Sequence, residues 1–249
     1  MTNRNFLFLL GALCLFSGCA TQRVPMEQDP LEGLNRAMFN VHEGLDTVLL
    51  KPVAQGYDAL LPNPIKRGVG NFFDNFRDLA RGGNALLQGK GEKGVTGIGR
   101  FLINSTLGVL GIFDVASEFG LERGTEDFGQ TLAVWGMPSG PYLFLPLIGP
   151  SGGRDLVGFG VDSYANPLWH LTRNDPATRN SLYATNVVQI RAALLPTDQI
   201  IEEASWDKYA YIRSAYLQRR AAEILDGSGG PTPLLDVDDL NGAEGPGGK

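Results

Sequence analysis

Apolar side chains recur at helical spacing in the first part of the chain. Residues that follow one another at alternating steps of four and three lie on one face of a helix. This spacing runs through Leu34, Met38, Val41, Leu45 and Val48. It predicts an amphipathic helix in a folded region that begins near Asp29. Pro52 is expected to kink or interrupt the helix, because proline lacks the backbone N–H that an interior helical residue donates.

Two stretches after Pro64 repeat the helical pattern. The first has an aromatic-rich apolar face made by Val69, Phe72, Phe73, Phe76 and Leu79. The second runs through Val95, Ile98, Phe101, Leu102 and Leu107. Farther along, the pattern predicts a helix over residues 182–194 and one longer helix over residues 199–225. The chain is therefore predicted to be mainly α-helical.

The pattern changes between Gly108 and Pro150, where glycines divide the sequence into short apolar pieces. Prolines at positions 138, 141, 146 and 150 exclude a continuous helix and argue against a central strand. This region is therefore predicted to form a hairpin-like segment with apolar walls rather than long regular elements.

The apolar faces of the predicted helices allow two arrangements. Periodicity alone favours a helical core, in which these faces pack on one another. In the alternative, the helices lie in the interface of a bilayer with one face against acyl chains. After Cys19 the chain contains no uninterrupted apolar run of the roughly 20 residues that a membrane-spanning helix requires.

The N-terminus has the layout of a secretory signal. Arg4 precedes an apolar run over residues 6–16, and Ser17 and Gly18 separate that run from Cys19. Residues 16–19 resemble a lipobox, so residues 1–18 are predicted to be a lipoprotein signal peptide and Cys19 the site of lipid attachment. The alternative is an ordinary cleaved signal. Ala20 stands where inner-membrane lipoproteins typically carry Asp, which predicts sorting to the outer membrane.

Composition and charge limit the partners and the domain boundaries that the mature chain can have. Loss of residues 1–18 would remove one basic residue and leave 20 basic against 27 acidic residues, which disfavours a nucleic-acid partner. Residues 19–28 are polar and predict a lipidated tether. The helical domain is expected over residues 29–225, and residues 226–249, rich in Gly, Pro and Asp, are expected to form a disordered acidic tail.

Two catalytic or cofactor motifs occur by pattern, and neither has the required context. Residues 149–153 match G-x-S-x-G, but a catalytic Ser151 needs a later acid and His within alternating strands and helices, and only His170 follows. We therefore expect a turn there, leading into a helix at Arg154. Residues 89–94 match G-x-G-x-x-G but follow a predicted helix, so a helix–helix turn is expected. The histidines are far apart and one cysteine survives, so neither metal, cofactor nor enzymatic activity is predicted.

Several short segments resemble one lipoprotein family in order and spacing. They are Asp29-Pro30-Leu31-Glu32-Gly33-Leu34-Asn35-Arg36, Asn71-Phe72, Leu87-Gln88-Gly89, residues 100–104, residues 111–116, Glu126-Asp127-Phe128-Gly129-Gln130-Thr131-Leu132, Trp135-Gly136, Gly140-Pro141-Tyr142 and Leu145-Pro146. From about Asp29 to Arg220, the chain resembles the MlaA family, also called VacJ lipoproteins.

The resemblance implies a ring-like bundle of amphipathic helices in the inner leaflet of the outer membrane, associated with a trimeric porin. Such a protein would draw phospholipid from the outer leaflet through an amphipathic channel and pass it to a soluble periplasmic carrier. No bond would be made or broken. The alternative is a structural adaptor that organises envelope proteins around a porin.

A hairpin would gate the lipid path in this scheme. Its predicted residues are Trp135, Gly136, Gly140, Pro141, Tyr142, Leu145 and Pro146. Gly136 and Gly140 would supply backbone freedom. Pro138 stands where the family often has Gly, and it restricts the same segment.

Overall fold

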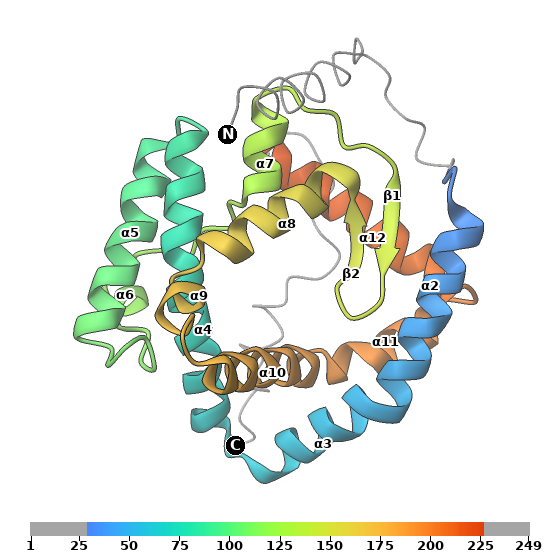
Figure 1. The fold of residues 1–249 in the computed structure, drawn as a ribbon, viewed down its shortest axis with the longest axis horizontal. Coiled ribbons are helices and arrows are strands. Elements are labelled where there is room, and N and C mark those ends of the chain that lie inside the picture. Colours follow the sequence, from blue (N-terminus) through green and yellow to red (C-terminus); the bar gives the residue numbers. More distant parts are fainter. Residues whose placement is uncertain (1–28, 227–249) are drawn as a thin grey trace, which may run out of the picture.

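A computed structural model describes residues 29–226 and shows a mainly helical chain with one small antiparallel sheet (Figure 1). The predicted signal peptide, Cys19, the tether and nearly all of the predicted tail lie outside the described residues. The elements are α2 (Glu32–Leu45), η1 (Asp46–Leu50), α3 (Lys51–Leu60), α4 (Asn63–Leu87), α5 (Gly91–Thr106), α6 (Val115–Glu118), α7 (Phe128–Val134), β1 (Tyr142–Leu145), β2 (Gly149–Gly152), α8 (Gly153–Ala165), α9 (Pro167–Leu171), α10 (Pro176–Ala193), α11 (Leu195–Ala204) and α12 (Lys208–Ile224).

Many of the elements, among them α2 to α5, lie around the periphery of the molecule in the view of Figure 1. Helices α2 and α3 form one side of this circuit, and the antiparallel pair α4 and α5 forms the opposite side. Helices α8 and α10 and the β1–β2 hairpin lie inside the circuit. None of the helices in residues 29–226 is long and apolar enough to cross a bilayer.

The first predicted helix is confirmed, and Pro52 affects it without breaking it. The backbone stays helical from α2 through η1 into α3, and the five residues of η1 form a π-helix immediately before Lys51 and Pro52. Proline lacks an N–H and its ring crowds the carbonyl four residues earlier. A π-helical turn, with its i to i+5 hydrogen bonds, accommodates both effects.

The prediction of one helix over residues 199–225 is wrong, because this region contains two helices. Helix α11 ends at Ala204, and α12 begins at Lys208 after the extended residue Ser205. The carboxylate of Asp207 accepts a hydrogen bond from the N–H of Ala210 at 3.1 Å. Asp207 is therefore an N-cap, and apolar periodicity gave no sign of this new helix start.

The hairpin is confirmed, but it lies farther along the chain than predicted. In the antiparallel pair, Tyr142 lies opposite Gly152 and Leu145 opposite Gly149. The turn between the strands covers residues 146–148 and includes Leu147. Leu147 and Gly149, the first residue of β2, both have positive φ angles. The expectation of a turn over residues 149–153 is therefore wrong, because residues 149–152 form β2. Helix α8 does follow directly, from Gly153.

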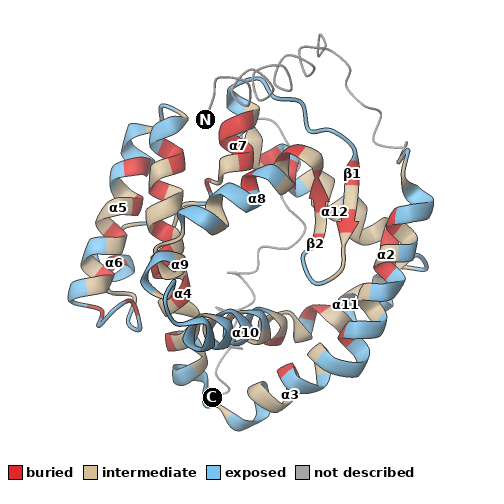
Figure 2. Cartoon of the chain, in the orientation of Figure 1, coloured by how far each residue is buried: buried red, intermediate tan, exposed pale blue. Residues whose placement is uncertain are grey.

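The interior of the described region is unusually polar. The largest fully buried side chains are Arg100, Gln130, Asn35, Asn75, Asn104, Thr131 and Asp78. An apolar core cluster is small and consists of Phe39, Tyr142, Phe144 and Tyr209. Figure 2 shows buried positions gathered where α4 meets α5 and where α7, α8 and the hairpin meet.

Many apolar side chains are exposed instead, which contradicts the interpretation of a simple helical core. On the first helix, Leu34, Val41 and Leu45 are 40–52% exposed and Val48 is 81% exposed. The buried positions of the same helix include Asn35 and Phe39. Helix α4 differs, since Phe73 and Phe76 on its aromatic face are buried.

Candidate functional site at the hairpin and the buried polar networks

The side chain of Asn35 holds the hairpin against α2. Its amide donates to the carbonyl of Tyr142 at 3.0 Å, and its carbonyl oxygen accepts from the N–H of Phe144 at 2.9 Å. Both backbone groups lie on the edge of β1 that faces away from β2. Asn35 is 1% exposed. A single buried amide therefore completes the hydrogen bonding of an edge strand, as a neighbouring strand would.

The carboxylate of Asp29 orients the Asn35 amide and also contacts helix α12. Its carboxylate accepts from the Asn35 amide at 3.1 Å and from the N–H of Leu31 at 3.0 Å. It also accepts from the hydroxyl of Tyr209 on α12. Burial and the hydrogen bond to Asp29 raise the pKa of Tyr209. Residues 29–36, through Asp29 and Asn35, therefore connect α2, the hairpin and α12.

Aromatic rings pack beneath this hydrogen-bonded point. Phe39 meets Phe144 edge to face, with ring centroids 5.3 Å apart, and meets Tyr209 at 5.8 Å. Tyr142 lies 5.9 Å from Tyr216. Edge-to-face pairs of this kind stabilise by about 0.5–1.5 kcal/mol beyond area burial. The base of the hairpin is therefore fixed by both polar and aromatic contacts.

The turn of the hairpin is held by a single histidine. Nδ1 of His42 accepts a hydrogen bond from the N–H of Leu147 at 3.2 Å, and its ring lies 5.5 Å from the ring of Phe144. Burial lowers the pKa of His42 and favours the neutral ring, which can act as acceptor. Leu147 and Ile148 at the turn are 55% and 50% exposed. The tip therefore presents half-exposed apolar side chains.

The structure brings most of the predicted hairpin residues together. Tyr142 and Leu145 lie in β1, Pro146 follows in the turn, and Gly140 and Pro141 lead into β1. The lead-in is tied to α8, because the N–H of Gly153 donates to the carbonyl of Pro141 at 3.1 Å.

Trp135 and Gly136 lie outside the hairpin: Trp135 is the C-cap residue of α7, and Gly136 follows it. The indole N–H of Trp135 donates to the carbonyl of Leu87 on α4 at 3.2 Å. Gly136 has φ +91° and Gly140 has φ +69°, conformations that favour glycine. The two glycines therefore lie at opposite ends of the short connection between α7 and β1.

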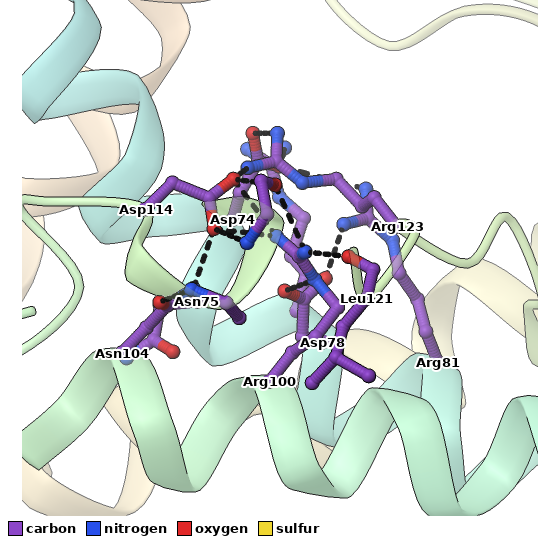
Figure 3. A network of polar contacts seen from close by, with 12 residues as sticks. Asp74, Asn75, Asp78, Arg81, Arg100, Asn104, Asp114, Leu121 and Arg123 are labelled. Atoms are coloured by element: carbon purple, nitrogen blue, oxygen red, sulfur yellow. Dashed lines mark hydrogen bonds and ion pairs between the residues drawn. The ribbon is translucent and has the colours of Figure 1, made fainter. Parts of the chain in front are cut away.

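A second polar centre surrounds Arg100, which is fully buried (Figure 3). Its guanidinium donates to the carboxylate of Asp78 at 3.0 Å and to both oxygens of Asp114 at 2.9 Å. It also donates to the hydroxyl of Ser117 and the carbonyl of Leu121. Arg100 thus joins α4, α5 and the segment that contains α6.

Asp114 is the shared acceptor of this network. It also accepts from the amide of Asn104 and the guanidinium of Arg123. Burial alone would raise the pKa of Asp114, but hydrogen bonds from Ser117, Asn104 and Arg100 outweigh it and hold the pKa at about 2. The carboxylate is therefore charged throughout the neutral pH range.

Little in the apolar pattern points to Arg100 or Asn35 as a buried centre. One signal was available on α5, where Gly94, Gly97, Arg100 and Asn104 recur at steps of three and four and make the buried face. These small and polar residues recur at the spacing usual for a buried helix face, while Val95 and Leu102 on the same helix are exposed. This combination indicates a helix whose polar side faces inward.

The tempting catalytic motif has no matching geometry. The hydroxyl of Ser151 on β2 donates to the carbonyl of Gly152 at 3.2 Å, and Nε2 of His170 is paired with the carbonyl of Tyr164 at 2.8 Å. Ser151 and His170 are therefore each hydrogen-bonded to a nearby backbone carbonyl. Within residues 29–226, no cluster of three or more His, Cys, Asp or Glu side chains could hold a metal ion.

Asn35→Ala is expected to lower the free energy of unfolding by about 2 kcal/mol, because the N–H of Phe144 and the carbonyl of Tyr142 lose their buried partner. Denaturant unfolding of the mature chain in mild detergent measures this change, and hydrogen exchange at Phe144 should accelerate. The exposed Asn40 on the same helix provides the control. Equal stability of Asn35→Ala and Asn40→Ala would contradict the role of Asn35.

Comparisons with known proteins agree with this geometry. The family model for MlaA lipoprotein matches residues 27–223. The chain is 35% identical over 212 residues to the intermembrane phospholipid transport system lipoprotein MlaA of Escherichia coli (strain K12), with 82% of each chain covered. It is 31% identical over 228 residues to the protein of the same name from Haemophilus influenzae, with 88% of this chain and 89% of that one covered.

A solved structure described as the structural basis for maintenance of bacterial outer membrane lipid asymmetry has a similar fold. The TM-score is 0.70 at 34% sequence identity, over 80% of this chain and 100% of that one. An uncharacterized protein of Rickettsia typhi, RT0044, is 38% identical over 197 residues, with 79% of this chain and 78% of that one covered. The chain belongs to the MlaA lipoprotein family.

Proposed function

We propose that this protein is a lipoprotein of an intermembrane phospholipid transport system and removes phospholipid from the outer leaflet of the outer membrane. The observation that carries this proposal is the inverted distribution of side chains, with polar networks inside and apolar faces outside. Large contiguous apolar surface on a soluble protein marks an interaction with lipid or protein. The names of the curated relatives point to phospholipid as the transported molecule.

The first helix fits a position within one leaflet. Its exposed stripe of Leu34, Val41, Leu45 and Val48 continues on α3 with Val53 and Leu60. An apolar face of this kind buries several ångströms into the boundary between headgroups and acyl chains. With lipid on Cys19, we place the protein in the inner leaflet of the outer membrane.

The lipid path in this proposal is amphipathic. Exposed apolar residues occur on the elements inside the circuit: Leu147 and Ile148 on the hairpin, Val157 and Val161 on α8, and Val187 and Ile190 on α10. Acyl chains would slide along such surface while the headgroup follows polar groups. A trimeric porin would be the membrane partner, and a soluble periplasmic lipid carrier would receive the phospholipid.

A deletion strain tests this function. Loss of the protein is expected to increase phospholipid in the outer leaflet and sensitivity to detergent, and the wild-type chain should restore both. A Cys19→Ser chain should be mislocalised and rescue poorly. Unchanged outer-leaflet phospholipid in the deletion strain would contradict the transport function and favour the envelope adaptor.

Gly136→Val and Gly140→Val are each expected to reduce rescue of the deletion strain. A β-branched residue with positive φ is strained by about 1–3 kcal/mol, so the connection between α7 and β1 must reorient. Gly120→Val is the matched control, because Gly120 also has φ +73° with open space around it but follows α6. If the Gly136 and Gly140 variants rescue as well as Gly120→Val at equal protein levels, the gating role of the hairpin is wrong.

A further inference from the structure

A pocket is lined by residues of α4, of α10 and of the segment that contains α9. Figure 1 shows where these helices lie in the fold. Arg77 and Arg179 line it together with hydrogen-bonding side chains that include Thr172 and Asn186. Phe73 and Leu182 are among its apolar lining residues. No acidic residue lines the pocket. The combination of two guanidinium groups, neutral polar groups and apolar wall favours an anionic ligand that carries an apolar part.

The charge of Arg77 is only partly compensated. Its guanidinium donates to the carboxylate of Asp74 at 2.8 Å and to the side-chain carbonyl of Asn186 at 2.8 Å. The same carboxylate is paired with Arg81 and with Arg123. Burial lowers the pKa of Arg77, and the neighbouring arginine charges lower it further. An added negative charge in the pocket would therefore be stabilised.

Arg179 is held in place by an aromatic ring rather than by a carboxylate. Its guanidinium carbon lies 5.0 Å from the centroid of the Trp169 ring, a cation–π geometry. Among the described residues, Arg179 forms no ion pair. Stacking on Trp169 orients the planar guanidinium and leaves its N–H groups for an oxygen-rich anion, which arginine binds in bidentate fashion.

The size of the pocket sets the part of the ligand that fits. The space that the centres of water molecules can occupy is about 30 Å³. One water needs about 10–15 Å³ on this measure, so the pocket has room for a phosphate-sized group and not for a whole lipid. The remainder of the ligand must extend out of the pocket.

We propose that Arg77, Arg179 and Asn186 form a binding site for the phosphate of a phospholipid headgroup. The inference rests on the proposed function and specifies which chemical group of the lipid the protein binds. The acyl chains would leave the pocket past Phe73 and Leu182. The site binds the phosphodiester that diacyl phospholipids share, and the net charge of the headgroup is secondary.

Titration calorimetry on the mature full chain in mild detergent tests the site. The probes are dihexanoylphosphatidylglycerol, dihexanoylglycerol, which lacks the phosphate, and inorganic phosphate. Arg179→Gln is expected to weaken binding of the phospholipid probe about tenfold, the effect of losing roughly one charge-assisted hydrogen bond. Arg173→Gln, an exposed arginine in the α9–α10 connection outside the pocket, should change affinity less than about twofold on the same scale.

Each outcome decides the proposal. Strong binding of the phospholipid probe, weak binding of both other probes and selective loss in Arg179→Gln support it. Equal affinity for dihexanoylglycerol would show that the phosphate is not recognised, and equal affinity for inorganic phosphate would indicate a site for free anions. Equal effects of Arg179→Gln and Arg173→Gln would also overturn it.

The deletion strain separates this proposal from the proposed function. If Arg179→Gln binds the probe normally while deletion still raises outer-leaflet phospholipid, the pocket assignment fails and the transport function stands. If deletion leaves outer-leaflet phospholipid unchanged, the transport function fails whatever the pocket binds. Arg179→Gln should also rescue the deletion strain less well than Arg173→Gln.

Discussion

Arg100→Ala is expected to lower the free energy of unfolding by about 3–5 kcal/mol, the cost of breaking a buried ion pair on one side only. Arg100 is 0% exposed and its guanidinium bonds two carboxylates, Asp78 and Asp114. Removal of the guanidinium would leave both carboxylates without their main positive partner in the interior. Denaturant unfolding of the mature chain in mild detergent, followed by circular dichroism, measures the change.

Arg219→Ala is the control for loss of a positive charge. Arg219 is 52% exposed and pairs with Glu223 at 3.3 Å, so its removal should cost less than about 1 kcal/mol. Both variants remove one positive charge, so the difference between their free energies of unfolding measures the effect of burial. A loss below about 1 kcal/mol for Arg100→Ala would mean that water or rearranged neighbours replace the guanidinium, and the network would not be the core of the α4–α5 unit.

Periodicity predicted which residues share a helix face and could not say what that face contacts. Leu34, Val41 and Leu45 on the predicted face are exposed, although Met38 on the same face packs against the core cluster, and Asn35 is buried. Amphipathic spacing has the same form for a helix that packs on a protein core and for one that lies in a bilayer interface. The buried polar networks, which apolar spacing does not reveal, accompany the exposed apolar faces.

The hairpin shows the same division between local and non-local information. Glycines and prolines near Pro141 correctly predicted a hairpin in place of long elements. Its attachment to α2 involves Asn35, which lies 107 positions before Tyr142, the residue whose carbonyl it binds. Local patterns contain no trace of such a contact. For the same reason the pairing of Arg100 with Asp78 on another helix could not be predicted from sequence spacing.

The helix break that was missed, between α11 and α12, has a local cause of a different kind. Asp207 begins α12 by accepting a backbone hydrogen bond, and a single capping side chain of this type can restart a helix within an apolar pattern that continues across it. Pro52 shows the converse, since a residue that normally breaks helices is accommodated by the π-helical η1. Apolar periodicity records neither effect.

The close contact between α4 and α5 depends on glycine and gives the second large effect. A Cβ atom at Gly97 would lie 2.8 Å from the Cα of Gly82, 2.9 Å from its nitrogen and 3.0 Å from the carbonyl oxygen of Asp78. All three are backbone atoms, which cannot move independently of α4. Small residues at such a contact let two helix backbones approach closely, as they do in membrane helices.

Gly97→Ala is therefore expected to force the helices apart and lower the free energy of unfolding by about 3 kcal/mol, at the upper end of overpacking costs. The shift would also move Arg100, one turn away, from Asp78. Gly99 lies on the same helix with nothing within 4 Å of an added Cβ, so Gly99→Ala should stabilise by about 0.5–1 kcal/mol through helix propensity. Opposite signs for two identical substitutions, two residues apart, distinguish helix contact from helix propensity. Stabilisation by both would show that α4 and α5 are not closely packed.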